Sequence, residues 1–310
     1  SALSHHVAIL LQPGPWVTAE VGVCGCGSPA TGRYHSATRL RGDMSRAQAD
    51  TSEVVAFENV SVVRDGSSLI QDITWHVHRH ERWVVLGPNG AGKTTMLQVA
   101  STYLGPTRGT VRLLGEQYGK VDVRKLRERL GYAGAAPAGL IRRDLPALDI
   151  VVSGRHASFV PTRFHHYTAE DWDLARSHLD RLAAGHLSDR RFGTLSSGEK
   201  QRMLIARSLM TRPEVLFLDE AMTGLDLGAR ERLVASLGEL AADPDSPAVV
   251  LVTHYVEEIP PEFTHIALVT DGKVVAAGPI DVVLDAEALS VTFGQPLQLE
   301  KRGGRFHAWS

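Results

Sequence analysis

The stretch Gly87-Pro-Asn-Gly-Ala-Gly-Lys-Thr-Thr95 decides the fold of this 310-residue chain. It follows the apolar run at residues 83–86, which is typical of a short buried strand, and it precedes a helical pattern at residues 96–100. A strand, a glycine-rich loop and a helix in this order direct backbone N–H groups and the positive end of the helix toward one point. The stretch therefore predicts a loop that binds the phosphates of a nucleotide.

Each residue of this loop has an expected place around the nucleotide. The backbone that closes around the β-phosphate comes from Gly87, Pro88, Asn89, Gly90, Ala91 and Gly92. Lys93 is expected to reach the β- and γ-phosphates, and the hydroxyl of Thr94 to ligate Mg²⁺. Thr95 lies one residue deeper, near the α-phosphate. ATP and Mg²⁺ are thus the expected cofactors.

Two further apolar runs end in side chains that suit phosphate chemistry. Residues 215–218 are continuously apolar, as in a buried parallel strand, and end in Asp219 and Glu220. We expect Asp219 to hold Mg²⁺ through water and Glu220 to polarise the attacking water. Another such run, residues 249–253, ends at His254, whose side chain is expected to reach the γ-phosphate. Lys93, Glu220 and His254 are the predicted catalytic residues.

A fourth motif, Leu195-Ser196-Ser197-Gly198-Glu199, opens a helical segment. With it, the chain resembles the nucleotide-binding subunits of ATP-binding cassette (ABC) transporters. LSSGE resembles the family's LSGGQ signature, GPNGAGKTT its phosphate loop and LFLDE its Walker B strand. Residues 224–226, which end in Asp226, resemble its D-loop, and His254 its switch histidine. The resemblance covers about residues 54–278.

The resemblance implies an α/β fold of the P-loop NTPase (RecA-like) type. Its core would hold a mainly parallel sheet, together with an antiparallel β subdomain and an inserted helical subdomain. We expect a disordered leader over residues 1–52, the ATPase domain over residues 53–285 with the helical subdomain at about 136–200, and a short C-terminal tail over residues 286–310. Leu179, Leu182 and Trp172 are expected to form a core stripe in the insert.

The resemblance also implies a mechanism that needs two copies of the chain. In this family the domains meet head to tail, and Ser196 and Gly198 of one copy contact the γ-phosphate held by Lys93 of the other. Two ATP molecules are sandwiched, and Glu220 then permits hydrolysis. The implied partners are a second copy and a separate transmembrane permease. Residues 159–164 are either a contact with the permease or an ordinary surface loop. The implied location is the cytoplasmic face of a membrane.

The chain departs from the family pattern in several places. The family's Gln after a Gly-Tyr-Val-Pro-Gln strand is absent, since residues 131–135 are Gly-Tyr-Ala-Gly-Ala and no Gln occurs between Gln117 and Gln201. That relay is either missing or replaced. Arg64 stands where an aromatic residue usually stacks on adenine, and its planar guanidinium is a candidate substitute. Ser197 replaces the first Gly of the signature.

These residues are compatible with three functions. A transporter ATPase is favoured, and residues 253–265 together with the missing Gln resemble a branch associated with molybdenum or iron uptake. The alternative is a stand-alone soluble ABC-type ATPase with a regulatory or repair role. A P-loop kinase or GTPase is disfavoured by the signature and by His254.

The remaining composition argues against other classes of protein. A net charge of −2 gives no field that would attract nucleic acid. The two cysteines, Cys24 and Cys26, indicate no disulfide framework and are too few for a zinc site. His76, His78 and His80 alternate along a predicted strand, where we expect a solvated face rather than a metal site.

Overall fold

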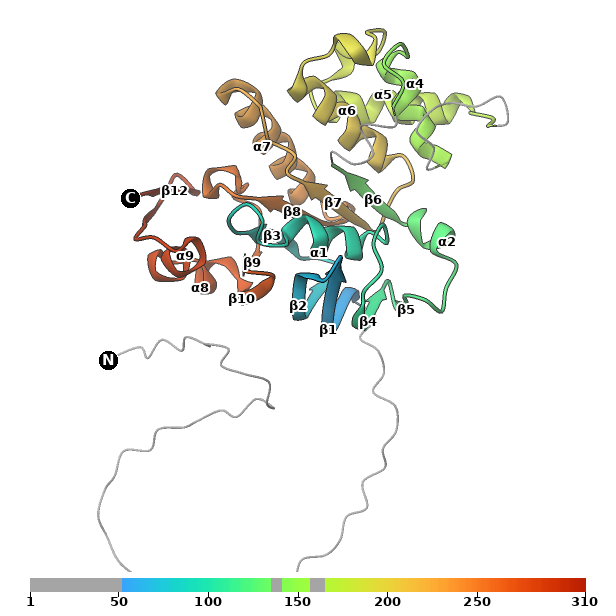
Figure 1. Ribbon diagram of the computed structural model, residues 1–310. Helices are drawn as coiled ribbons and strands as arrows, with labels where there is room; N and C mark the ends of the chain where they lie inside the picture. The colour runs from blue at the N-terminus through green and yellow to red at the C-terminus, as the bar shows by residue number, and fades with distance from the viewer. Residues whose placement is uncertain (1–51, 135–140, 157–164) are drawn as a thin grey trace, which may run out of the picture.

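The computed structural model describes residues 52–134, 141–156 and 165–310, and residues 1–51 of the predicted leader and the loop at residues 159–164 lie outside these ranges. A six-stranded sheet in the order β10-β9-β3-β8-β7-β6 forms the centre of the molecule (Figure 1). Its strands run parallel except β10, which is antiparallel to β9. Their bounds are β3 Arg82–Leu86, β6 Leu130–Ala133, β7 Val215–Asp219, β8 Ala248–Thr253, β9 His265–Thr270 and β10 Lys273–Pro279.

The central strands are apolar throughout because both faces of the sheet are covered. On β3, Val84 and Leu86 face one hydrophobic cluster, whereas Val85 between them faces the other. The first cluster includes residues of the helical subdomain and of α7 (Leu227–Ala242). The second includes α1 (Lys93–Ala100) and the antiparallel sheet. The side-chain period of two thus places the sheet between two layers.

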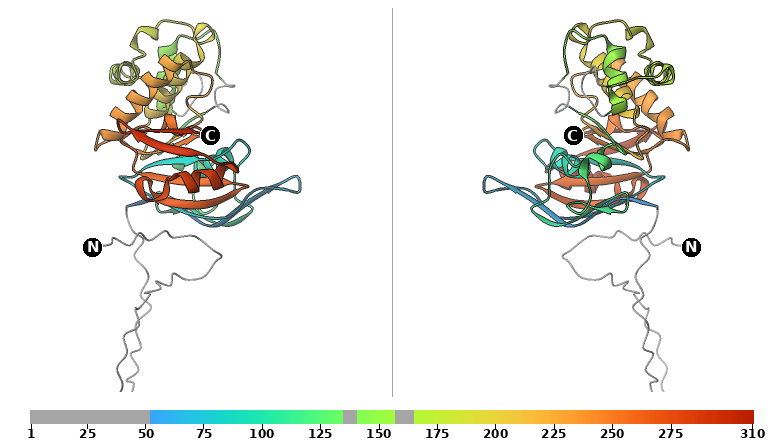
Figure 2. Two further views of the ribbon diagram at one scale, coloured as in Figure 1. Left: turned by 90° about the vertical axis from the view of Figure 1, so that its left-hand side faces the viewer. Right: turned by 90° about the vertical axis from the view of Figure 1, so that its right-hand side faces the viewer.

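A second, four-stranded sheet in the order β2-β1-β4-β5 is antiparallel and forms the predicted β subdomain. Its strands are β1 Glu53–Arg64, β2 Ser67–His78, β4 Arg108–Leu113 and β5 Glu116–Gln117. The β1–β2 hairpin extends away from the core in Figure 2. Residues 54–57 and 60–63, which the pattern predicts as two strands, form the single strand β1. Asn59 between them has a φ of 50°, and the pairing register shifts there.

The histidines at residues 76, 78 and 80 do not share one strand face, because β2 ends at His78 and His80 lies in the following turn. His76 Nδ1 lies 2.6 Å from Glu53 Oε1, and His78 Nδ1 lies 3.3 Å from Glu81 Oε1. Within the described ranges no group of three or more His, Cys, Asp or Glu side chains could hold a metal ion. Because β2 ends at His78, the part of the prediction that places His80 on the strand is wrong.

The helical subdomain is inserted between β6 and β7 and forms the upper part of Figure 1. Its helices are α4 Ala147–Ser153, α5 Ala169–Arg181 and α6 Ser197–Leu209, with 3-10 turns at Gly154–His156, Gly185–Leu187 and Phe192–Thr194. Leu179 and Leu182 are buried, and Trp172 packs against the same cluster, which confirms the predicted core stripe. A short helix, α2 (Val123–Arg127), precedes β6.

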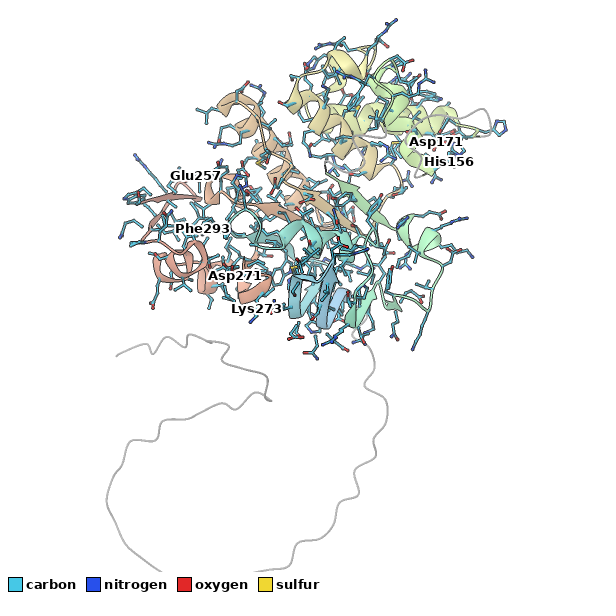
Figure 3. All side chains as sticks on the ribbon, in the orientation of Figure 1. His156, Asp171, Glu257, Asp271, Lys273 and Phe293 are labelled. Atoms are coloured by element: carbon cyan, nitrogen blue, oxygen red, sulfur yellow. The ribbon has the colours of Figure 1, made fainter. Side chains whose placement is uncertain are left out.

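The C-terminal segment is folded onto the core. It contains α8 Ile280–Val283, α9 Ala286–Phe293, and a hairpin of β11 Gln298–Arg302 with β12 Arg305–Trp309. Leu289 and Phe306 are buried in the main cluster. Arg305 donates to Glu231 Oε2 on α7 at 2.9 Å and to the carbonyl of Glu257, labelled in Figure 3. The segment expected to be a short tail therefore carries a helix and a hairpin that pack on the domain.

In the part of the chain that the structure describes, none of the helices is both long and apolar enough to cross a membrane.

The stability of the helical subdomain should depend on pH through His178, which is buried on α5. Burial, aided by Arg181 and Arg212, lowers the pKa of His178 to about 4. The unfolded chain takes up a proton near pH 6.5, whereas the folded chain does not. The free energy of unfolding should therefore be highest above about pH 6.5 and fall as the pH drops to about 4.

Urea unfolding between pH 4.5 and 8 measures this effect. In His178→Leu the fall should become shallower, whereas the same replacement of the exposed His186 should leave the wild-type slope. Equal slopes in wild type and His178→Leu would contradict the assignment.

Candidate nucleotide-binding site

A cavity of about 540 Å³ opens at the carboxyl ends of β3 and β7, the edge where open parallel sheets bind ligands. Its walls come from the phosphate loop, the end of β7, the start of β2 and the turn between β9 and β10. The lining residues are Ser68, Leu69, Gly90, Ala91, Gly92, Lys93, Thr94, Thr95, Glu220, Asp271 and Gly272.

The glycines of the loop are required by its path. Gly90 and Gly92 have φ values of 79° and 97°, in the region that favours glycine. Gly87 passes so close to β9 that a Cβ there would lie 1.9 Å from the carbonyl oxygen of Val269. This close approach brings the loop over the sheet edge and starts α1 at Lys93, so that the first-turn N–H groups of α1 are available to an anion.

Lys93 is buried inside its own loop. Its Nζ donates to the carbonyl oxygens of Gly87 and Pro88, both at 2.8 Å. Burial lowers the pKa of Lys93, while the nearby carboxylates of Glu220 and Asp219 act in the opposite direction. The loop thus holds a positive charge at the floor of the cavity, close to two carboxylates.

Asp219, at the end of β7, receives hydrogen bonds on both carboxylate oxygens. The Thr94 hydroxyl donates to Oδ1 at 3.0 Å, and the Tyr132 hydroxyl donates to Oδ2 at 3.0 Å. Burial raises the pKa of Asp219, and the two hydrogen bonds partly offset this effect. Thr94 and Asp219 were predicted together, whereas the contact with Tyr132 was not.

Glu220 lies at the cavity with an unusual backbone. Its φ is 50°, a left-handed conformation that is uncommon outside glycine and concentrates at functional sites. Its N–H donates to the carbonyl of Val252 on β8 at 3.2 Å. Glu220 is one of the residues that line the cavity.

His254 follows β8 but does not line the cavity. Its ring contacts Tyr255, with centroids 4.1 Å apart. The Nδ1 atom is buried, and no described residue forms a hydrogen bond with it. Because buried polar atoms are normally paired, this atom suits a ligand or a partner that brings its own polar group.

The signature residues lie away from the cavity of their own chain. Ser196 caps α6 and exchanges hydrogen bonds with Glu199, while Leu195 is buried beneath them. Ser197, which replaces the family's Gly, donates to the carbonyl of Gly224 at 2.9 Å. Gly198 is closely packed, since a Cβ there would lie 3.2 Å from Leu225 and 3.3 Å from Ala229.

These contacts join the signature to the predicted D-loop. Asp226 caps α7 by accepting from the N–H of Ala229 at 2.7 Å. The starts of α6 and α7 are thus packed together, and Ser196 and Ser197 are exposed at this joint.

Several wall residues were missed by sequence reasoning. Ser68 and Leu69 come from β2, and Asp271, labelled in Figure 3, comes from the β9–β10 turn. Gly272 of that turn donates to the carbonyl of Ala91 at 3.0 Å. An Asp-Gly pair predicts a turn but not what the turn contacts. Conversely Arg64, Gly87, Pro88 and Asn89 do not line the cavity, and Arg64 is exposed at the end of β1.

A second, smaller cavity of about 140 Å³ lies between the core and the helical subdomain. Its lining includes Tyr132, Tyr103, Arg127, Gly154 and the buried Arg207. Burial lowers the pKa of Arg207 to about 10.

Comparisons with known proteins point to one family. A family profile described as ABC transporter matches residues 70–223. The ABC transporter ATP-binding protein YlmA of Bacillus subtilis is 39% identical over 79% of this chain and 93% of its own length. A putative ABC transporter ATP-binding protein of Streptococcus mutans is 35% identical over 79% and 94%.

The fold also matches solved structures. A dimeric post-hydrolysis state of an ATP-binding cassette bound to ADP and phosphate superposes with a TM-score of 0.63, at 22% identity over 73% of this chain and 98% of that one. The molybdenum or iron branch is supported only distantly. The molybdate/tungstate import protein WtpC of Thermococcus kodakarensis is 31% identical over 71% of the chain and 63% of its own length.

Replacing Lys93 tests the site most directly. Lys93→Ala should weaken binding of a fluorescent ATP analogue by about 30-fold or more, because removing one buried charge contact costs about 2 kcal/mol or more. Hydrolysis should be abolished. Lys120→Ala, which removes an exposed lysine outside the cavity, serves as the matched control. Normal ATP binding in Lys93→Ala would exclude this cavity as the nucleotide site.

Proposed function

Since this chain belongs to the ATP-binding proteins of ABC transporters, we propose that it binds and hydrolyses MgATP and thereby drives a separate membrane permease. The observation that carries the proposal is the meeting of Lys93, Thr94 and Glu220 in one cavity beside Asp219. The names of the relatives favour this function over a stand-alone regulatory or repair ATPase.

The residues present fit a magnesium ion. The Thr94 hydroxyl and the Asp219 carboxylate place two oxygen atoms 3.0 Å apart, and Mg²⁺ prefers oxygen ligands. When bound with ATP, Mg²⁺ supplies positive charge that offsets the charge of the phosphates. In this proposal Thr94 and Asp219 are the residues that hold it.

The chain's own groups account for the remaining chemistry. The backbone N–H groups at residues 90–95 bind and orient the phosphates, and Lys93 exchanges its two loop carbonyls for phosphate oxygens. Glu220 accepts a hydrogen bond from the attacking water and orients it. His254 offers its buried ring nitrogen Nδ1, which has no hydrogen-bond partner among the described residues, to the γ-phosphate. Arg64 is proposed to stack on adenine from the tip of the β1–β2 hairpin.

A second copy of the chain completes the site in this proposal. The exposed Ser196 and the α6 N-terminus at Gly198 do not line their own cavity, which leaves them available to the γ-phosphate of a partner copy. Leu195, Ser197 and Glu199 support this motif, and Asp226 fixes it against α7. A head-to-tail homodimer would therefore bury two ATP molecules.

The permease is proposed as a separate chain, with this subunit bound at the cytoplasmic face of the membrane. Affinity purification from native membranes in mild detergent, followed by mass spectrometry, tests this partnership. A stoichiometric partner with several membrane spans would support it, whereas an active ATPase without such a partner would favour the stand-alone function.

Slowing hydrolysis should trap the dimer. Glu220→Gln keeps the shape of the side chain but removes the base, so the ATP-bound state should persist. Light scattering with saturating MgATP should then give twice the monomer mass. An ATPase assay should give a turnover about 100-fold slower or less, because general base catalysis contributes about this factor. Glu257→Gln, on the turn after β8 and outside the cavity, is the control. A monomer with ATP bound would contradict the sandwich.

A further inference from the structure

Tyr132 lies where β6 leads toward the helical subdomain, and its hydroxyl is buried against Asp219. The hydroxyl donates to Oδ2 of Asp219 at 3.0 Å, while Thr94 donates to Oδ1 at the same distance. Tyr132 is 7% exposed and Asp219 8%. Two donors on opposite oxygens fix the plane of the carboxylate, which a short side chain with two rotatable bonds cannot do alone.

The local backbone is adapted to this contact. Gly134 follows Tyr132 by two residues, and a Cβ at Gly134 would lie 2.9 Å from the Tyr132 hydroxyl oxygen and 3.0 Å from Cβ of Asp219. A side chain here would therefore press directly on the hydrogen-bonded pair. The other side of the Tyr132 ring contacts Tyr103, at 5.2 Å between centroids, and borders the smaller cavity.

The relay expected after this strand cannot come from the family's Gln. Ala135 occupies its place, and an alanine side chain has no polar atom to offer. The Tyr of the family's Gly-Tyr pair is retained as Tyr132, and its hydroxyl donates to Asp219. Of the two side-chain donors to Asp219, Thr94 is itself proposed as a metal ligand. The Tyr132 hydroxyl has no proposed contact with the metal, so its hydrogen bond can act only through Asp219.

We propose that Tyr132 is a positioning residue, whose hydroxyl orients the carboxylate of Asp219 for Mg²⁺. This inference rests on the proposed role of Asp219. It requires that loss of the hydroxyl lowers the affinity for Mg²⁺ and leaves the affinity for the nucleotide itself unchanged.

The variant Tyr132→Phe tests this role, because it removes one oxygen atom and keeps the ring. Affinity for a fluorescent ATP analogue in EDTA should stay within about twofold of wild type. The Mg²⁺ concentration for half-maximal hydrolysis should rise about tenfold, the scale of one hydrogen bond to a charged group. Tyr103→Phe makes the same change on the neighbouring ring, which forms no hydrogen bond with Asp219 in the described part of the chain, and should leave both values unchanged.

A second measurement does not depend on turnover. Mn²⁺ titrated into the ADP complex and followed by electron paramagnetic resonance should bind Tyr132→Phe about tenfold more weakly than wild type. In an Asp219→Ala background the same Tyr132→Phe change should have no further effect, because the two residues act as one unit.

Three outcomes would overturn the inference. They are unchanged metal dependence in Tyr132→Phe, an equal loss of ATP affinity in EDTA, and full additivity with Asp219→Ala. Absence of hydrolysis in the wild-type chain would instead overturn the proposed function, and the Mn²⁺ titration would still decide on Tyr132.

Discussion

The hydrogen bond between Thr94 and Asp219 is the contact on which the site depends. It joins the start of α1 to the end of β7, two segments 125 residues apart in the chain. The bond is possible because β3 and β7 both pair with β8 in parallel, so their carboxyl ends reach the same edge. The short apolar strands set this edge, and the glycine loop bends α1 over it. The charges of Lys93 and Asp219 are then held close together where both side chains are buried, and their interaction is stronger there than in water.

The local parts of this site could be predicted from the sequence. A buried strand followed by a glycine loop, or by two acidic residues, places Lys93, Thr94, Asp219 and Glu220 by chain continuity alone. Their encounter then follows from the parallel sheet. The same holds for the core stripe at Leu179, since helical spacing reports which face is buried.

Contacts across the fold could not be predicted in this way. Ser68 and Asp271 line the same cavity because β2 contacts the β9–β10 turn, where the N–H of Gln71 donates to the carbonyl of Gly272. No local pattern encodes a contact between segments about 200 residues apart. Tyr132 looks like any aromatic residue in a strand until its hydroxyl is placed on Asp219. The C-terminal hairpin was missed because short strands carry little periodic signal, and Arg305 is tied to Glu231 and Glu257 only in three dimensions.

The position of the insert connects the helical subdomain to the two strands that end at the site. The chain leaves the core at the end of β6 and returns through α6 to β7, and these two strands are neighbours in the sheet, with Leu130 paired to Val215. Tyr132 and Asp219 lie at the ends of the same two strands. The insert therefore connects the strand that carries Tyr132 to the strand that carries Asp219. The start of α6 at Ser197 belongs to the same insert, so the segment proposed to meet a partner copy is joined by the chain itself to the strand that carries Asp219.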